Sequence, residues 1–225
     1  MTSLFAAGVL DPAELLKAGG FILLLVIVFA ESGLLIGFFL PGDSLLFVAG
    51  MVAAGTFADA FPKAGDVSFG VPLWVLLASI FVAAFLGDQV GYAFGRKVGP
   101  ALFRKEDSKL FKKAYVDKAQ SFFEHHGPRA IILARFVPVV RTFCPIVAGV
   151  GHMEYRTFVR FNIIGALLWG VGVTLLGYFL GSIPLVRDNI EIALLEVVAV
   201  SLGPVAFEFV RHRRQAKSAA APTES

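Results

Sequence analysis

The chain consists mainly of long apolar stretches separated by short polar segments. Neither Lys nor Arg occurs from Gly19 to Ala58, which is about twice the ~20 residues that one membrane-spanning helix needs. Val71 to Phe94 and Phe158 to Gly181 each have the length and apolar character of one spanning helix, and Ile190 to Val210 predicts another. The pattern therefore predicts an all-α, polytopic integral membrane protein with three or more spanning helices.

Two of the apolar stretches are interrupted by residues that ordinary spanning helices avoid. The first stretch, 19–58, is broken near Pro41-Gly42-Asp43, and a later stretch, 130–152, contains Pro138 and Pro145. Irregular backbone at membrane depth is tolerated only where protein surrounds it or where it lines a cavity. We therefore predict two re-entrant helical hairpins that enter from opposite faces of the membrane. For 19–58, two ordinary spans joined by a surface turn remain an alternative.

A short internal similarity suggests that the two hairpins are related. Phe47-Val48-Ala49-Gly50 and Ile146-Val147-Ala148-Gly149 each follow a Pro and a charged residue. Inverted repeats whose broken helices meet at the membrane midplane occur in several transporters. The expected architecture is therefore an inverted repeat built from the two hairpins.

The composition excludes a soluble globular class and indicates an orientation. Hydrophobic residues make up 57% of the 225 residues and charged residues 16%, against roughly 25% charged in soluble domains. Basic residues concentrate between Arg96 and Arg129 and again in Arg211-His212-Arg213-Arg214. Both basic segments are expected on the cytoplasmic side. The C-terminus is therefore predicted to be cytoplasmic.

Three regions are predicted along the chain. Residues 1–18 form an N-terminal interfacial helix, because Asp11-Pro12-Ala13-Glu14 has the cap, first-turn Pro and third-position Glu of a helix start. Residues 19–210 form one transmembrane domain, which includes an amphipathic surface helix around Phe111 to Phe122. Residues 211–225 form a basic, disordered tail.

Four charged residues inside the apolar stretches carry the candidate chemistry. They are Glu31 and Asp43 in the first stretch and Arg135 and Arg141 in the later one. Such charges are costly in hydrocarbon and are usually functional. Because two acids and two bases sum to zero, they are expected to neutralise one another in one buried site. A purely structural set of ion pairs is an alternative that is compatible with a ligand site.

The residue types suggest a role for each pair. A break at Pro138 would let Arg135 and Arg141 converge, and guanidinium groups bind phosphate through two parallel hydrogen bonds. Both arginines are therefore predicted to bind the phosphate of a substrate. Glu31 and Asp43 can take up and release protons, and they are predicted to be proton-coupling residues.

Asp88 and Arg96 are auxiliary candidates on the helix that begins near Val71. The favoured interpretation of Asp88 is structural: an acid near a helix end that snorkels to the interface or caps the helix. Gly91, Gly95 and Gly99 follow at every fourth position, which predicts close approach of a neighbouring helix. No metal site is predicted, since His125-His126 has no second ligand pair. No cofactor or nucleic-acid partner is predicted either.

The charged residues lie in sequence blocks that resemble the DedA family, also called the SNARE-associated or VTT-domain membrane proteins. The resemblance covers about residues 19 to 181. The blocks are Glu31-Ser32-Gly33, Phe39 to Ser44, Gly87-Asp88 through Gly95-Arg96, Phe123 to Gly127, Arg135 to Pro138, Arg141 to Pro145, and Ala148-Gly149. In that family an acidic pair and an arginine pair are needed for function, and they fall here on Glu31, Asp43, Arg135 and Arg141.

The resemblance implies a multi-pass protein of the bacterial cytoplasmic (inner) membrane that moves lipids between leaflets. It implies a proton-linked flippase for a lipid phosphate, with undecaprenyl phosphate as the first candidate substrate. The expected partners are that lipid or a phospholipid, protons and the membrane, and the sequence leaves a homo-oligomer open. A phospholipid flippase or scramblase and a proton-coupled carrier of a small solute are the alternatives, and no enzymatic activity is expected.

Overall fold

The computed structural model describes residues 11–34, 40–62, 65–102, 127, 129–135 and 138–188. Within these ranges all regular structure is helical and no strand occurs. Three helical runs are long and apolar enough to cross a membrane: Pro12–Gly33, Leu73–Val98 and Tyr155–Leu180. They correspond to the first apolar stretch and the two spans expected from the sequence, so the prediction of an all-α membrane protein is confirmed for this part of the chain.

Several predictions fall on residues that the structure does not describe. They are the span at 190–210, the amphipathic helix around Phe111 to Phe122, the His125-His126 pair and the basic tail at 211–225.

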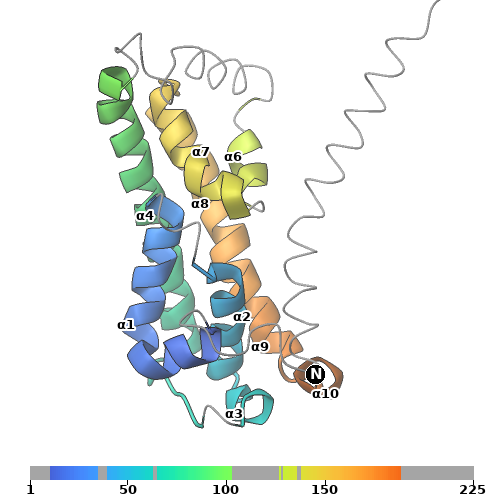
Figure 1. Cartoon of the computed structure of the whole chain (residues 1–225). Coiled ribbons are helices and arrows are strands. Elements are labelled where there is room, and N and C mark those ends of the chain that lie inside the picture. The colour runs from blue at the N-terminus through green and yellow to red at the C-terminus, as the bar shows by residue number, and fades with distance from the viewer. Residues whose placement is uncertain are drawn as a thin grey trace, which may run out of the picture.

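The helices follow one another in the order shown in Figure 1. They are α1 (Pro12–Gly33), α2 (Gly42–Ala53), α3 (Phe57–Ala60), α4 (Leu73–Leu102), α6 (Arg129–Ala134), α7 (Pro138–Val150), α8 (Tyr155–Ala166), the π-helical η2 (Leu167–Val171), α9 (Gly172–Leu180) and α10 (Pro184–Asp188). The run from α8 through η2 to α9 is continuous and forms the third candidate span.

Helix α1 begins as the sequence predicts and then changes direction. The Ala13 N–H donates to the Asp11 carboxylate at 2.8 Å, and Pro12 occupies the first turn. Gly20 has φ 54° and ψ −142°, a backbone conformation that glycine adopts at little cost. The first part of α1 therefore lies across the longer part that follows Gly20, as Figure 1 shows. The interfacial position of this first part stays a prediction.

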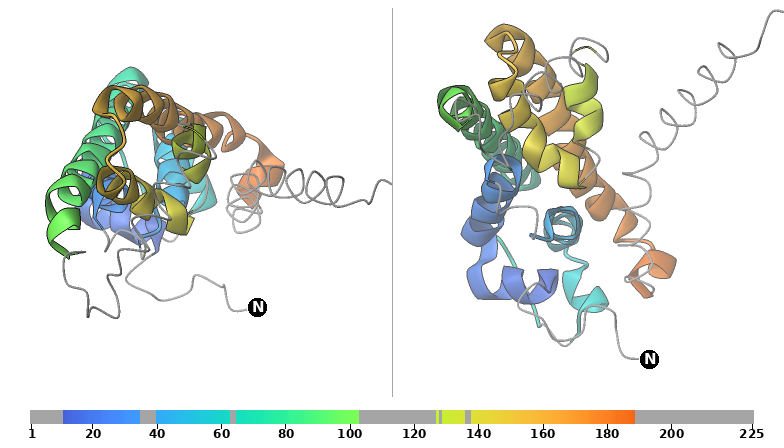
Figure 2. Two further views of the ribbon diagram at one scale, coloured as in Figure 1. Left: turned by 90° about the horizontal axis from the view of Figure 1, so that it is seen from above. Right: turned by 45° about the horizontal axis from the view of Figure 1, so that its top comes forward.

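Helix α4 lies against two partners, and glycines permit the closest contact. It packs along α1 on one side and along α7 on the other, while α2 packs against α9 (Figures 1 and 2). A Cβ atom placed on Gly95 would lie 2.1 Å from the Ile146 carbonyl oxygen. Only glycine leaves room for this approach, so the expected close helix packing is confirmed at Gly95.

The buried side chains form two apolar clusters with a polar layer between them. On α4 the buried face runs through residues at four-residue spacing, namely Leu76, Ile80, Ala84, Asp88 and Tyr92. The first three belong to the larger cluster with α1, α2 and α9, and Tyr92 belongs to the smaller cluster with α7 and α8. Asp88 therefore lies where the two clusters meet, and Asn162 occupies the corresponding place on α8 between Phe158 and Ala166.

The outer faces of the candidate spans are apolar as well. Ile22, Trp74 and Phe179 are 74%, 72% and 64% exposed. Large exposed apolar side chains are unfavourable in water but suit contact with lipid. These faces agree with the assignment of the three runs to the membrane.

We predict that Gly95→Ala destabilises the protein because the added methyl group would meet the backbone of α7. The expected cost is about 1–3 kcal/mol, the usual range for overpacking. Thermal unfolding in detergent measures it, with Ala93→Leu as the control because Ala93 is exposed on the same helix. Equal unfolding midpoints for Gly95→Ala and the wild type would contradict the close contact of α4 with α7.

Candidate functional site: two buried arginines

Arg141 is held between two carboxylates from the first apolar stretch. Its Nη1 donates to Asp43 Oδ1 at 2.6 Å, and its Nη2 forms an ion pair with Glu31. Arg141 lies in the first turns of α7, Glu31 near the end of α1, and Asp43 in the first turn of α2. These three residues are at most 6% exposed. The predicted meeting of the acidic pair with an arginine is therefore confirmed for Arg141.

The start of α2 suits this arrangement in two ways. Asp43 in its first turn is favourably placed at the positive end of the helix dipole. The Glu31 carboxylate lies directly against the backbone of Gly42, because a Cβ atom on Gly42 would be 1.4 Å from Glu31 Oε2. Any side chain at position 42 would occupy the space of that carboxylate.

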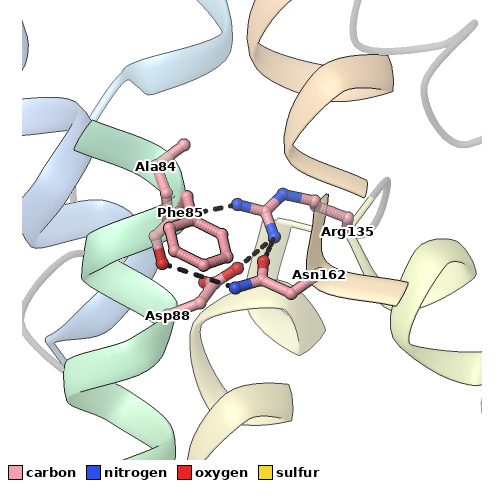
Figure 3. Close-up of polar contacts among 5 residues, drawn as sticks. All are labelled: Ala84, Phe85, Asp88, Arg135 and Asn162. Atoms are coloured by element: carbon pink, nitrogen blue, oxygen red, sulfur yellow. Dashed lines mark hydrogen bonds and ion pairs between the residues drawn. The ribbon is translucent and has the colours of Figure 1, made fainter. Parts of the chain in front are cut away.

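Arg135 has a different set of partners from the one expected. It follows the end of α6 and forms an ion pair with Asp88 of α4. Its Nη1 also donates to Asn162 Oδ1 at 2.8 Å, and its Nη2 donates to the Ala84 carbonyl at 3.4 Å. Figure 3 shows the guanidinium turned toward α4, with Asp88 and Asn162 beside it. The expectation that Arg135 pairs with Glu31 or Asp43 is therefore wrong.

Asp88 is a member of the buried charge cluster and not a residue of a helix end. It is 2% exposed and lies about 22 Å along α4 from Leu73 and about 15 Å from Val98, at 1.5 Å per residue. The interpretation of Asp88 as a snorkelling or capping acid is wrong, because the nearby Arg135 supplies its counter-charge inside the protein. Its position within the apolar stripe at four-residue spacing on α4 is the sequence signal that could have identified it.

The addition of Asp88 changes the charge balance. Three carboxylates, those of Glu31, Asp43 and Asp88, face two guanidiniums in the buried part of the described chain. With every group ionised the cluster has a charge of −1, whereas the sequence predicted zero. An uncompensated charge is costly away from water, so one carboxyl group is expected to hold a proton or to face a bound cation.

Trp169 links the two arginines and was not identified from the sequence. Its Nε1 donates to Asp43 Oδ1 at 2.6 Å, and its ring centroid lies 4.5 Å from the Arg141 Cζ and 5.7 Å from the Arg135 Cζ. Trp169 is fully buried within η2. Tryptophan in membrane proteins is usually found near helix ends, so a tryptophan in the middle of a span is a signal that could have indicated this site.

The break between α6 and α7 places both arginines around this ring. Helix α6 ends at Ala134 and α7 begins at Pro138, as the predicted break at Pro138 requires. Each guanidinium also has an unpaired donor. The buried Nε atoms of Arg135 and Arg141 have no hydrogen-bond partner among the described residues. Two further N–H groups are thus available to an anion that enters the cluster.

Arg96 does not reach this cluster. It is exposed two turns beyond Asp88 on α4, where its Nη1 donates to the Tyr92 hydroxyl at 2.8 Å. The Tyr92 hydroxyl in turn donates to the Met153 carbonyl at 2.6 Å. The structure therefore brings one of the two auxiliary residues, Asp88, to the site and leaves Arg96 outside it. No group of three or more metal-ligating side chains occurs within the described ranges.

The fold and site together define a helical membrane protein with ion-paired arginines in its interior. Residues 40–179 match the VTT domain. The chain is 46% identical to Protein DedA of Escherichia coli (strain K12) over 211 residues, which are 92% of this chain and 91% of that protein. It is 49% identical over 181 residues to an uncharacterized membrane protein of Mycobacterium leprae (strain TN), covering 80% and 75% of the two chains.

A third relative is more distant. The inner membrane protein YqjA of Escherichia coli (strain K12) is 36% identical over 164 residues, or 73% of this chain and 69% of that protein. The chain therefore belongs to the DedA family of VTT-domain membrane proteins. No solved structure matches it. The VTT-domain match, residues 40–179, contains every polar residue of the site described above except Glu31, which precedes it.

We predict that Asp88→Asn destabilises the protein by about 3–5 kcal/mol, because it leaves Arg135 buried without a counter-charge. Adding Arg135→Gln should recover much of this loss, since the unpaired charge is then removed. Unfolding in mixed micelles titrated with sodium dodecyl sulfate measures the free energies. Asp88→Asn combined with Arg141→Gln is the matched control and should recover nothing; equal recovery in both double variants would disprove the pairing.

Gly42→Ala should disrupt the other half of the site, because its methyl group would occupy the position of the Glu31 carboxylate. We expect a loss of stability and of the function proposed below. Ala49→Gly, which removes a methyl group from a buried position on the same helix, controls for general changes in α2. If Gly42→Ala has the stability and the activity of the wild type, Glu31 does not lie against this backbone.

Proposed function

We propose that the protein is a proton-linked lipid transporter, a flippase that moves a lipid phosphate across the cytoplasmic membrane. Undecaprenyl phosphate is the first substrate to test. The observation that carries the proposal is the sharing of the buried Arg141 by Glu31 and Asp43. An arginine keeps its charge, so a carboxylate partner that is protonated or moves away leaves Arg141 in need of another anion.

The arginines supply the donors that a phosphate needs. A guanidinium binds phosphate oxygens through charge-assisted hydrogen bonds, often two at once. Arg135 and Arg141 both lie near the Trp169 ring, and each has an Nε–H that no described residue accepts. A phosphate group close to this ring could accept from both arginines without breaking every ion pair.

The carboxylates supply a means of coupling this binding to protons. The cluster has one more acid than base among the described residues, and this supports binding of at least one proton. Protonation of Glu31 or Asp43 removes negative charge beside Arg141 and so favours entry of a phosphate. Release of the proton restores the ion pairs and expels the phosphate.

The lengths of the short helices support the proposed re-entrant hairpins, and the inverted repeat of these hairpins stays part of the proposal. Helices α2 and α7 have 12 and 13 residues and are therefore about 18–20 Å long. The hydrocarbon core of a bilayer is about 30 Å thick, so neither helix alone reaches across it. One short helix comes from each predicted hairpin, and Asp43 and Arg141 join them.

A phospholipid flippase or scramblase could use the same groups, since phospholipids also contain a phosphate. A proton-coupled carrier of a small solute is the remaining alternative. The charged side chains of the cluster are all buried, so this conformation is closed around them. A lipid carrier must open sideways toward the bilayer, and a lateral opening stays a prediction.

The experiment that tests the function measures lipid movement in proteoliposomes. Undecaprenyl phosphate or a labelled phospholipid is placed in one leaflet, and its arrival in the other is followed with and without a proton gradient. We expect movement of chemically unchanged undecaprenyl phosphate that depends on the gradient. Movement of phospholipid alone would favour the flippase or scramblase alternative. Proton flux without movement of either lipid would favour a solute carrier.

Glu31→Gln should abolish this transport or its dependence on pH, because the amide cannot exchange a proton. Arg141→Gln should lower the rate about ten- to hundredfold, the loss expected for a charged hydrogen bond worth about 1.5–3 kcal/mol. Glu14→Gln is the matched control, since Glu14 is an exposed acid on the same helix as Glu31. Wild-type rate and pH dependence in Glu31→Gln would refute the role of Glu31.

A further inference from the structure

Trp169 contacts both halves of the charge cluster, although each half has its own ion pairs. One half consists of Arg141 with Glu31 and Asp43, and the other of Arg135 with Asp88. The Trp169 ring lies near both guanidiniums, and its N–H donates to Asp43. A change at either arginine or at Asp43 therefore acts on the same indole.

Ordinary core packing explains only part of this arrangement. A buried tryptophan needs a partner for its N–H, and Asp43 provides one. Packing does not require two cations near the ring, and a guanidinium within about 6 Å of an aromatic ring is attracted to its face. Trp74, the other tryptophan of the chain, is 72% exposed at the start of α4, as expected for a residue at the membrane interface.

The backbone around Trp169 is also unusual. Leu167–Val171 is a π-helical segment inside an otherwise α-helical span. Single-turn π-helical segments are frequently found at functional sites. From this segment Trp169 contacts Asp43 of α2, Arg135 after α6 and Arg141 in the first turn of α7, although these elements are distant in sequence.

We infer that Trp169 is a positioning residue that joins the two ion-paired halves into one unit. A proton taken up by Asp43 weakens the hydrogen bond that the indole N–H donates to this carboxylate. The contact of the ring with both arginines changes as a result. A phosphate that draws either guanidinium away from the ring acts on Asp43 by the same route in reverse, as linkage requires. This inference rests on the proposed function for its role in transport, but the coupling itself does not require a lipid.

The titratable and charged groups that face this unit come from every element packed around it. They are Glu31 of α1, Asp43 of α2, Asp88 of α4, Arg135 after α6, and Arg141 and Cys144 of α7. A pH titration of the unit therefore reports on the whole cluster, and variants are needed to assign it to single residues.

The test uses Trp74→Phe, which leaves Trp169 as the only tryptophan. Its fluorescence is recorded against pH in detergent without added lipid. We expect an emission that changes with pH, a shifted emission with a reduced pH response in Asp43→Asn, and a shifted emission in Asp88→Asn. The last result is specific to the inference, because Asp88 is ion-paired with Arg135 and would act on the ring through that guanidinium.

Glu14→Gln in the same background is the control and should leave the emission unchanged. An emission that is indifferent to Asp88→Asn, while the circular dichroism spectrum stays native, would overturn the coupling. Failure of the wild-type protein to move any lipid would contradict the proposed function but would leave this fluorescence result intact. The two failures are therefore distinguishable.

Transport by Trp169 variants supplies a second readout. Trp169→Phe keeps an aromatic ring for the arginines but removes the donor to Asp43, so we expect the pH of half-maximal transport to shift while much of the maximal rate remains. Trp169→Leu removes both contacts and should lower the rate at every pH. A structural role alone would lower the amount of folded protein and leave the pH profile of the remainder unchanged, and this outcome would refute the positioning role.

Discussion

The structure depends on the requirement that a charge inside a membrane protein meets an opposite charge. Arg141 satisfies this requirement with two carboxylates, Glu31 at the end of α1 and Asp43 at the start of α2. Three segments that are separated by up to 110 residues thereby meet at one guanidinium. Because a buried charge that is separated from its partners is costly, the positions of α1, α2 and α7 are tied to one another. The short α2 and the break before α7 both serve this meeting.

Stability alone gives a weak reason for such a cluster. Well-packed apolar residues can often replace a buried ion pair without loss of stability, and two apolar clusters already pack on either side of the polar layer. The layer also has an odd number of charged groups and two unused Nε donors among its described members. A surplus acid and spare donors are features that favour exchange of protons and anions over a fixed structural role.

Much of the fold could be predicted because hydropathy and charge are local properties. Two spanning helices, the helix start at Asp11 and the break before Pro138 were all expected and are all present. The partner of Arg135 was not predictable in this way. Asp88 is 47 residues away in sequence, and only the packing of α4 against α7 and α8 brings it within reach. The stripe at four-residue spacing could have marked Asp88 as buried, but it would not have identified its partner.

The sequence by itself determined that this is a helical membrane protein with charges inside its apolar stretches, because the cost of placing polar groups in lipid is evident residue by residue. It also determined the chemical types available, namely guanidiniums, which are able to bind an anion, and carboxyls, which are able to take up a proton. Only the tertiary structure decided which charges pair, that Asp88 makes the cluster unequal, and that Trp169 lies between the arginines. Those outcomes depend on the rotation and depth of each helix, and these are set by contacts among residues far apart in the chain.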